Sequence, residues 1–285
     1  MSQQHATEQH LHHLSEMRNI LNAMKNLAFM ESRKLFRLLK SQRQMVFNLE
    51  RVATDFLNFH PYTETVNESL HNIYLLIGSE RGFCGNFNEK LGQAFTQKYP
   101  LDNDPIDTII VVGNKLSKHL KDDSRVARFI DGASFEEEIE TVLNTIVSVV
   151  NELQQQYSYI TLTVVYHGEQ SDQINIQKLL PPFQVTPETL DFTHAPLMNL
   201  STEAFFADLS EHYLLAVLHE ISYTSLMIEN NWRAQHLDGA VNRLDKNTET
   251  LQQKCRMLRQ EAITEEIEVI LLSAESMLQI NRNSS

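Results

Sequence analysis

Glycine, arginine and cysteine cluster in one short stretch, residues 78–88, which reads GSERGFCGNFN. The stretch follows an apolar run and precedes a helix-forming segment. Glycine-rich turns in that position bind phosphate through backbone amides in many proteins. The spacing, however, matches neither GxGxxG nor GxxxxGK[ST]. The residues therefore favour a tight strand-to-helix turn, which needs glycine backbone geometry, over a nucleotide site.

Cys84 is the candidate nucleophile of this stretch. A cysteine reacts as its thiolate and needs a histidine or basic neighbour to activate it. Arg81 is close in sequence, but no His/Asn set accompanies it, so we assign no catalytic residue. We interpret Arg81, Gly82, Cys84, Gly85 and Asn88 as the residues that shape the turn, with Asn88 as the N-cap of the following helix.

Four histidines crowd the first 13 residues: His5, His10, His12 and His13. Imidazoles near one another can chelate a metal ion. No Cys or Asp completes a ligand set there, so the interpretation that we favour is a polar helix start. We predict no metal site and no cofactor.

The tract 259–270, RQEAITEEIEVI, combines an apolar stripe with polar neighbours. The stripe consists of Ile263, Ile267 and Ile270. Polar side chains lie on the surface beside it: Gln260, Thr264 and Glu266. The acidic residues of the tract form no i,i+3 or i,i+4 metal pair with a histidine. By composition alone, this is a solvated face beside a packed seam.

This tract belongs to a long C-terminal helix. Residues 197–285 contain no proline and a single glycine, Gly239, and most residues from Thr202 to Ile280 are good helix formers. About 75 helical residues span roughly 110 Å, which is far more than the width of a globular domain. Helices of that length are typical of coiled coils, and this one is too charged to span a membrane.

The predicted partner is the N-terminal segment, residues 1–60, which also lacks glycine and proline. Heptads counted from Leu14 place thirteen residues at the core positions, of which eleven are apolar. These are Leu14, Met17, Leu21, Met24, Ala28, Glu31, Leu35, Leu38, Gln42, Met45, Leu49, Val52 and Phe56. The unbroken 3-4 spacing predicts a coiled coil.

The matching seam of the C-terminal helix runs through Leu237, Val241, Leu244, Thr248, Leu251, Cys255, Leu258 and Ala262. It then shifts phase to Ile263, Ile267, Ile270, Ala274 and Met277. Such a stutter relaxes the supercoil locally, so we expect the helix beyond it to face something different. The N-terminal segment carries a net charge of +3 and residues 202–285 carry −6, which favours their antiparallel pairing.

The middle of the chain has a different pattern, since 14 of its 15 Gly and Pro residues lie between Pro61 and Pro196. Apolar runs predict strands at 72–79, 107–113 and 159–167, with a possible fourth at 173–177. Helical segments alternate with them, including one from Ser134 to about Tyr157 that a capping box with Glu137 opens. This order predicts βαβ units around a mainly parallel sheet. Pro181, Pro182, Pro187 and Pro196 mark an irregular connector.

The predicted fold class is therefore α/β: an antiparallel coiled coil of long terminal helices flanking a small Rossmann-like domain. We expect domain boundaries at 1–60, 61–196 and 197–285. The formal charge of −13 argues against nucleic acid as a partner. Two cysteines, the absence of a long apolar run and the absence of a signal peptide predict a soluble, cytoplasmic chain.

Three motifs carry a resemblance that spans the chain. The tract 259–270 is similar to the C-terminal signature of the gamma subunit of F-type ATP synthases, close to ARQxxITxEIxEI. The turn 80–88 resembles that family's DRGLCGGxN, and the segment 20–28, ILNAMKNLA, resembles its ITKAMKMVA. The chain departs from the family at Asn22, Glu31, Glu80 and Asn86, which suggests a divergent member.

The resemblance implies a non-catalytic central-stalk rotor subunit, which couples proton or sodium-ion flow to ATP synthesis or hydrolysis in the beta subunits. The implied partners are the alpha and beta subunits of the F1 hexamer, the epsilon subunit and the c-ring, without nucleic acid or direct membrane insertion. The implied location is the cytoplasmic face of a bacterial inner membrane. Its implied coupling contacts are Met24, Arg259, Gln260, Thr264 and Glu266.

Two alternatives remain open from the residues. A coiled-coil scaffold or adaptor unrelated to ATPases fits the helices equally well, but leaves the two specific motifs, the turn and the C-terminal tract, unexplained. A small α/β enzyme that handles phosphate would need the stretch 78–88 to bind a ligand.

Overall fold

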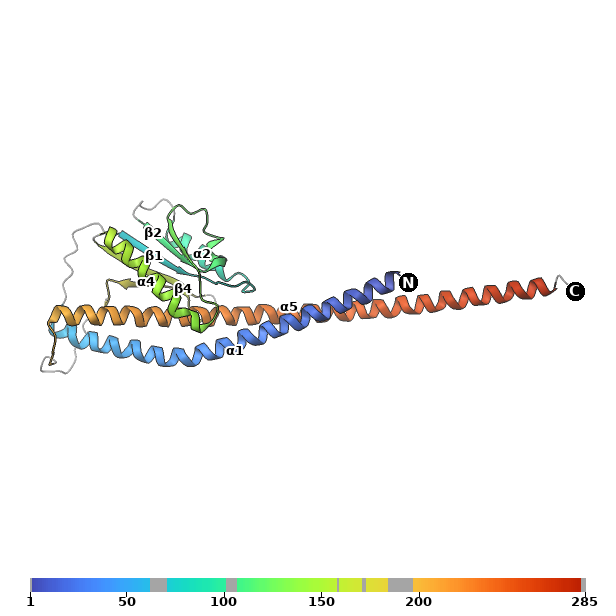
Figure 1. Cartoon of the computed structure of the whole chain (residues 1–285), viewed down its shortest axis with the longest axis horizontal. Coiled ribbons are helices and arrows are strands. Elements are labelled where there is room, and N and C mark those ends of the chain that lie inside the picture. Colours follow the sequence, from blue (N-terminus) through green and yellow to red (C-terminus); the bar gives the residue numbers. More distant parts are fainter. Residues whose placement is uncertain are drawn as a thin grey trace. The chain divides into compact units, whose positions relative to one another are not determined.

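The computed structural model describes residues 2–61, 71–100, 107–157, 159–170, 173–183 and 197–282 (Figure 1). Its elements, in chain order, are α1 (Ser2–Phe59), β1 (His71–Ile77), α2 (Phe87–Lys98), β2 (Asp107–Val112), α3 (Asn114–Ser117), β3 (Val126–Ile130), η1 (Glu136–Glu138), α4 (Ile139–Gln156), β4 (Ile160–His167), β5 (Ile174–Leu180) and α5 (Thr202–Arg282). The chain forms two compact units: Met1–Asn26 with Gln235–Ser285, and Leu27–Ala234.

Each long helix therefore contributes to both units. The division at 1–60, 61–196 and 197–285 follows the ends of the long helices more than the compact units, and it stays a prediction. Pro187 and Pro196 lie outside the described residues.

The second unit contains a five-stranded sheet in the order β3-β2-β1-β4-β5. The pairs β1–β2, β1–β4 and β2–β3 are parallel, and β5 runs antiparallel to β4. Parallel strands are usually covered on both faces, and for this reason they read as continuous apolar runs. The mainly parallel sheet between long terminal helices confirms the predicted fold class.

Alternate residues of β1 serve two separate cores. Ile73 and Leu75 face a core that includes α4 and the parts of α1 and α5 in this unit. Tyr74 and Leu76 face a second core with α2 and α3. Because successive side chains of a strand point to opposite faces, one strand stabilises both layers.

The apolar pattern of the sequence did not predict β3, and the capping box predicted for Ser134 and Glu137 is wrong. The strand β3 is short and three of its five residues are exposed, so it carries no continuous apolar run. At the start of α4, the backbone amide of Ser134 donates to Glu138 Oε2 at 2.7 Å, whereas Glu137 binds Lys34. The expected capping partner is thus displaced by one residue, because an ion pair with α1 holds Glu137.

Helix α1 keeps the predicted seven-residue repeat in the second unit, but half of its core positions are shifted by one residue. The buried residues are Ala28, Ser32, Leu35, Leu39, Val46, Ala53 and Phe56. Ser32, Leu39, Val46 and Ala53 replace the predicted Glu31, Leu38, Met45 and Val52. In most of these pairs the predicted residue is the larger or more apolar one. The small side chains of Ser32 and Ala53 instead permit close approach of α1 to its neighbours. Ser32 Oγ donates to Asn231 Oδ1 of α5 at 2.6 Å.

The first unit pairs the start of α1 with the later part of α5 in antiparallel fashion. Arg18 Nε donates to Asp245 Oδ1 at 2.5 Å, and Lys25 Nζ donates to Asp238 Oδ1 at 3.1 Å. Leu237 and Val241 are buried, and the later seam residues to Ala262 are half-buried. The predicted seam of α5 is therefore confirmed over that range. Met17 is an exception on α1, since it is 46% exposed.

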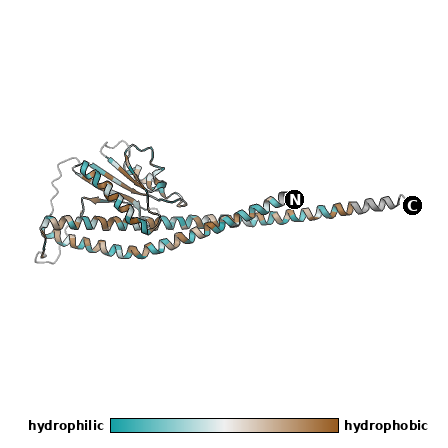
Figure 2. Ribbon diagram, viewed as in Figure 1, coloured by the Kyte–Doolittle hydropathy of each residue, from teal (hydrophilic) through white to brown (hydrophobic). Residues whose placement is uncertain are grey.

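The predicted phase shift after Ala262 stays a prediction, because every described side chain from Ile263 to Leu272 is exposed. Ile263, Ile267 and Ile270 are exposed, unlike the seam that precedes them. If the register of Arg18 and Lys25 continues, Ser2 lies opposite about residue 261, so α5 extends beyond the start of α1. Figure 2 shows that apolar residues continue along α5 toward its C-terminal end. The side chains of Ala274 and Met277 lie outside the described part of the chain.

The shifted register of α1 predicts unequal costs at two adjacent residues. Val46→Asp places an unpaired carboxylate in the core and should lower the free energy of unfolding by about 3 kcal/mol or more. Met45→Asp, at a side chain that is 49% exposed, should change it by less than about 1 kcal/mol. Urea unfolding of the two variants measures the difference. A larger loss of stability in Met45→Asp than in Val46→Asp would support the register predicted from the heptads.

Candidate functional site

The turn after β1 contains backbone positions that require glycine or that strain any other residue placed there. A Cβ atom on Gly78 would lie 2.4 Å from Leu116 Cβ and 2.8 Å from Asn88 Oδ1. Phe83 and Gly85 both have positive φ angles, of 65° and 60°. Phe83 is also 52% exposed. The tight strand-to-helix turn that the glycines predicted is therefore present.

Asn88 closes this turn from inside α2. Its Oδ1 accepts a hydrogen bond from the Ser79 amide at 2.9 Å, and its Nδ2 donates to Ser79 Oγ at 2.8 Å. The helix begins one residue earlier, at Phe87, and Asn86 occupies the N-cap position without a side-chain cap. The prediction that Asn88 is the N-cap was wrong, because its amide binds back across the turn.

Glu80 ties the turn to the carboxyl ends of the neighbouring strands. Its carboxylate accepts hydrogen bonds from the Asn114 amide at 3.0 Å, from Asn114 Nδ2 at 2.6 Å and from the Gly132 amide at 2.7 Å. Partial burial acts to raise the pKa of Glu80, but these hydrogen bonds hold that pKa below its ordinary value. The Glu80 carboxylate thus joins segments that follow β1, β2 and β3.

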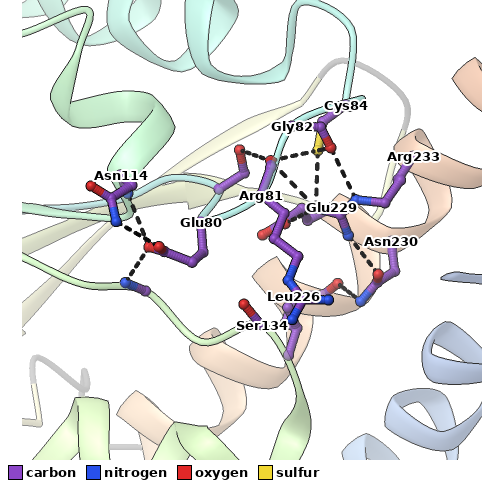
Figure 3. A network of polar contacts seen from close by, with 12 residues as sticks. Glu80, Arg81, Gly82, Cys84, Asn114, Ser134, Leu226, Glu229, Asn230 and Arg233 are labelled. Atoms are coloured by element: carbon purple, nitrogen blue, oxygen red, sulfur yellow. Dashed lines mark hydrogen bonds and ion pairs between the residues drawn. The ribbon is translucent and has the colours of Figure 1, made fainter. Parts of the chain in front are cut away.

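Arg233 of α5 binds the other side of the turn (Figure 3). Its Nε donates to Gly82 O at 3.1 Å, and its Nη2 lies 3.4 Å from Arg81 O and 3.3 Å from Cys84 Sγ. On its own helix, Nη1 donates to Asn230 Oδ1 at 2.6 Å, and Nη2 donates to Glu229. The planar guanidinium suits such a set of directed bonds, which the flexible ammonium of lysine does not reproduce.

Glu229 is the buried counterion of Arg233, and it is only 3% exposed. Burial raises the pKa of Glu229 to about 7, although the Arg233 guanidinium and the Arg81 amide oppose the rise. A charged group in such a place is normally paired and hydrogen-bonded, as this one is. The pair therefore joins α5 to the backbone of the turn at the cost of desolvating two charges.

Cys84 lies in the same cluster with its thiol directed at backbone carbonyls. Its Sγ lies 3.4 Å from Arg81 O and 3.4 Å from Gly82 O. Burial and the nearby charge of Glu229 raise the pKa of the Cys84 thiol to about 11. The thiol is therefore protonated at neutral pH, which agrees with a structural role and opposes the alternative of a nucleophile.

The side chain of Arg81 points away from this cluster. Its guanidinium lies over the ring of Phe135, 4.3 Å from the ring centroid. One turn thus contains all five predicted residues: Arg81, Gly82, Cys84, Gly85 and Asn88. Some of their backbone and side-chain groups contact the sheet edge, and others contact α5.

Trp232, the only tryptophan of the chain, lies beside Arg233 on α5. Its ring contacts Phe87 and His167, with centroid separations of 5.9 and 5.7 Å. Lys90 Nζ lies 4.9 Å from the centroid of the same ring. Two successive residues of α5 therefore hold the turn and the start of α2.

Four residues of this cluster were not predicted from the sequence: Glu229, Asn230, Trp232 and Arg233. A signal was nonetheless present, because Glu229 and Arg233 are spaced i,i+4 directly after the apolar run LMI. Burying two charges beside an apolar helical segment costs free energy unless both are hydrogen-bonded to specific partners.

The predicted coupling residues form two separate groups in the first unit. Met24 is half-buried, whereas Arg259, Gln260, Thr264 and Glu266 are exposed on α5. The contact of Lys25 with Asp238 places Met24 near residue 238, about 30 Å along the helix from Arg259. Thr264 Oγ1 donates to Gln260 O at 2.9 Å. The structure therefore does not gather these five residues into one site.

Neither a metal-binding cluster nor a cofactor-sized cavity lies beside the turn in the described part of the chain. Among the described residues, no group of three His, Cys, Asp or Glu side chains could hold a metal ion. A cavity at the carboxyl ends of β1 and β2, lined by Gly78, Gly132 and Glu229, has a volume of about 30 Å³. Pockets for cofactors and substrates are roughly ten times larger. No helix in the described part of the chain is long and apolar enough to cross a bilayer.

Comparison with known proteins defines the class of protein to which this arrangement belongs. A family profile described as ATP synthase matches residues 3–277. Since the match covers nearly the whole chain, the chain belongs to this ATP synthase family.

Individual relatives agree with that assignment. The chain is 23% identical over 270 residues to the ATP synthase gamma chain of Clostridium botulinum strain Langeland, covering 92% of this chain and 94% of the relative. The gamma chain of Clostridium perfringens strain SM101 is also 23% identical, over 272 residues.

Solved structures share the fold. One is the rotor of the Euglena gracilis mitochondrial ATP synthase, with a TM-score of 0.62 and 17% identity, covering 92% of this chain and 99% of that one. Another is the central stalk and c-ring structure from Tetrahymena thermophila, with a TM-score of 0.57 and 18% identity, covering 78% and 99%.

The backbone of the turn predicts opposite effects for two glycine substitutions. Gly78→Ala should destabilise the chain by about 1–3 kcal/mol, because its Cβ would overlap Leu116. Gly92→Ala is the matched control, since Gly92 lies within α2 and a Cβ added there would meet no atom within 4 Å. It should stabilise by about 0.5–1 kcal/mol through helix propensity. Thermal unfolding compares the two variants, and equal shifts would refute the proposed close approach.

Burial of Glu229 predicts a distinct dependence of stability on pH. The folded pKa of about 7 exceeds the ordinary value of 4.5, so the folded state binds more protons than the unfolded state between these values. The free energy of unfolding should therefore fall as pH rises through this window. Glu229→Gln should remove this part of the slope, and the exposed Glu211→Gln should retain it. Urea unfolding at pH 5 to 8 tests this; an unchanged slope in Glu229→Gln would contradict the assignment.

Proposed function

We propose that the chain is the central-stalk rotor subunit of an F-type ATP synthase. The observation that carries this proposal is the antiparallel pairing of its two terminal helices, together with a mainly parallel α/β domain between them, in a member of the ATP synthase family. The turn 80–88 and the tract 259–270 support it, because both resemble gamma-subunit motifs and occur in the expected order.

In this function the chain performs no covalent chemistry. Rotation driven by proton or sodium-ion flow would present different sides of the paired helices to each beta subunit in turn. A surface that differs around its circumference can favour one conformation of a partner over another, and the difference is a coupling free energy. The exposed polar residues of the tract and the predicted phase shift after Ala262 would supply such an asymmetric surface on α5.

The proposed partners are the alpha and beta subunits of the F1 hexamer, the epsilon subunit and the c-ring. Met24 and the group Arg259, Gln260, Thr264 and Glu266 would contact the hexamer at two levels, since the part of α5 opposite Met24 lies about 30 Å along the helix from Arg259. The protein would be peripheral, at the cytoplasmic face of a bacterial inner membrane.

Purification of the tagged chain from its own organism tests the proposal. We expect alpha and beta subunits to copurify in a complex that hydrolyses ATP, with epsilon and the c-ring present when mild detergent is used. A complex with other proteins and without ATPase activity would instead favour the alternative of an unrelated coiled-coil scaffold. A chain that purifies alone from intact cells would also contradict the rotor function.

Exposed residues of α5 provide a matched test of the coupling contacts. Gln260→Leu and Thr264→Val should lower ATP-driven ion pumping relative to ATP hydrolysis by about fivefold, with little change in unfolding temperature. Gln252→Leu and Thr250→Val are the controls, since Thr250 is also exposed and its Oγ1 donates to Lys246 O at 3.0 Å, as Thr264 does to Gln260. Unchanged pumping and hydrolysis rates in the first pair would remove these residues from the coupling surface.

A further inference from the structure

The α/β domain and helix α5 share a large apolar core, and directed polar bonds join the two as well. Core residues of α4, α5 and the sheet pack in one cluster. The hydrophobic effect is proportional to the apolar area removed from water and carries no direction, so directed bonds add a constraint on orientation that burial itself does not supply. A rotor whose domain must turn with its shaft needs directed bonds as well.

The described contacts provide such bonds at Arg233. The guanidinium makes contacts with two backbone carbonyls of the turn, with the Cys84 sulfur and with two side chains of α5. The residue is 6% exposed, so water competes little for these bonds. Because the buried guanidinium is bound from several directions, the turn has one orientation relative to α5.

The turn transmits this constraint to the sheet through Glu80. Its carboxylate binds Asn114 and Gly132, which follow β2 and β3. The backbone between Glu80 and Gly82 is therefore held at one end by the sheet edge and at the other by α5. Figure 3 shows Glu80 and Arg233 on opposite sides of this short segment.

We propose that Arg233 is a positioning residue for rotary coupling, which fixes the rotational register of the α/β domain on α5 through the backbone of residues 81–84. This inference rests on the rotor function and deepens it. The apolar core supplies no directed bonds, and the exposed ion pairs are accessible to water. Arg43, for example, joins α1 to Glu220 and Glu169, but its side chain is 42% exposed, and exposed ion pairs contribute little.

The test uses the assembled ATP synthase complex containing this chain. Arg233→Met keeps most of the side-chain volume and removes every donor. We expect ATP hydrolysis to persist, while ATP-driven ion pumping per ATP falls about fivefold because the domain slips on the shaft. Arg43→Met, the matched control, should leave this ratio unchanged. A loss of stability alone would lower hydrolysis and pumping together and would leave their ratio unaltered, and that result would overturn the proposal.

A spectroscopic measurement on the isolated chain complements the ratio. Trp232 packs on Phe87 and His167 next to Arg233, so its fluorescence reports this contact. We expect Arg233→Met to increase acrylamide quenching of Trp232 while far-ultraviolet circular dichroism stays unchanged, and Arg43→Met to match the unsubstituted chain. Unchanged quenching in Arg233→Met would show that the turn keeps its position without the guanidinium.

Arg233→Met leaves the buried Glu229 without its cation, so a second variant guards against failure to fold. Arg233→Met combined with Glu229→Gln removes both charges, and it should show the same lowered pumping ratio and increased quenching. If the unsubstituted chain assembles no ATPase, the rotor function fails. If the chain assembles but both variants couple normally, only the role of Arg233 fails.

Discussion

The carbonyl groups of the turn after β1 impose the main constraint on this part of the molecule. The tight turn between β1 and α2 directs backbone carbonyls toward the partly buried side that faces α5, and each of these acceptors needs a donor. Arg233 supplies donors from α5 and thereby requires a counterion, which Glu229 provides one helical turn earlier. Burial of the pair is costly, but removal of either member would leave a lone charge, so the two residues and the turn depend on one another.

The architecture was largely predictable because it follows from the two simplest periodicities. Continuous apolar runs identified three of the strands, and the absence of proline with at most one glycine, Gly239, identified both terminal helices. The seam of α5 from Leu237 to Ala262 was correct residue by residue, since one helix packed on one partner buries a narrow stripe. On α1 the repeat was correct but its phase was partly wrong. There the helix belongs to a wider core, and Ser32 and Ala53 are buried because they are small.

The candidate site was predictable only where a residue's role is local. The glycines of the turn were recognisable, because their backbone geometry is set by immediate neighbours. Asn88 was misassigned because its amide binds Ser79 across the turn, and Arg233 was missed because its acceptors lie about 150 residues earlier in the chain. Contacts of this kind depend on how strands and helices are brought together, and no spacing rule in a single sequence encodes them.

The apolar side chains near the end of α5 have a consequence for how the protein is produced. Ile263, Ile267, Val269, Ile270, Leu271 and Leu272 are each at least half exposed. Water tolerates contiguous surfaces of this type poorly, and they promote self-association. Polypeptide chains in which the end of α5 stays uncovered would therefore tend to self-associate. In the rotor proposed above, synthesis in step with the covering subunits would prevent that self-association.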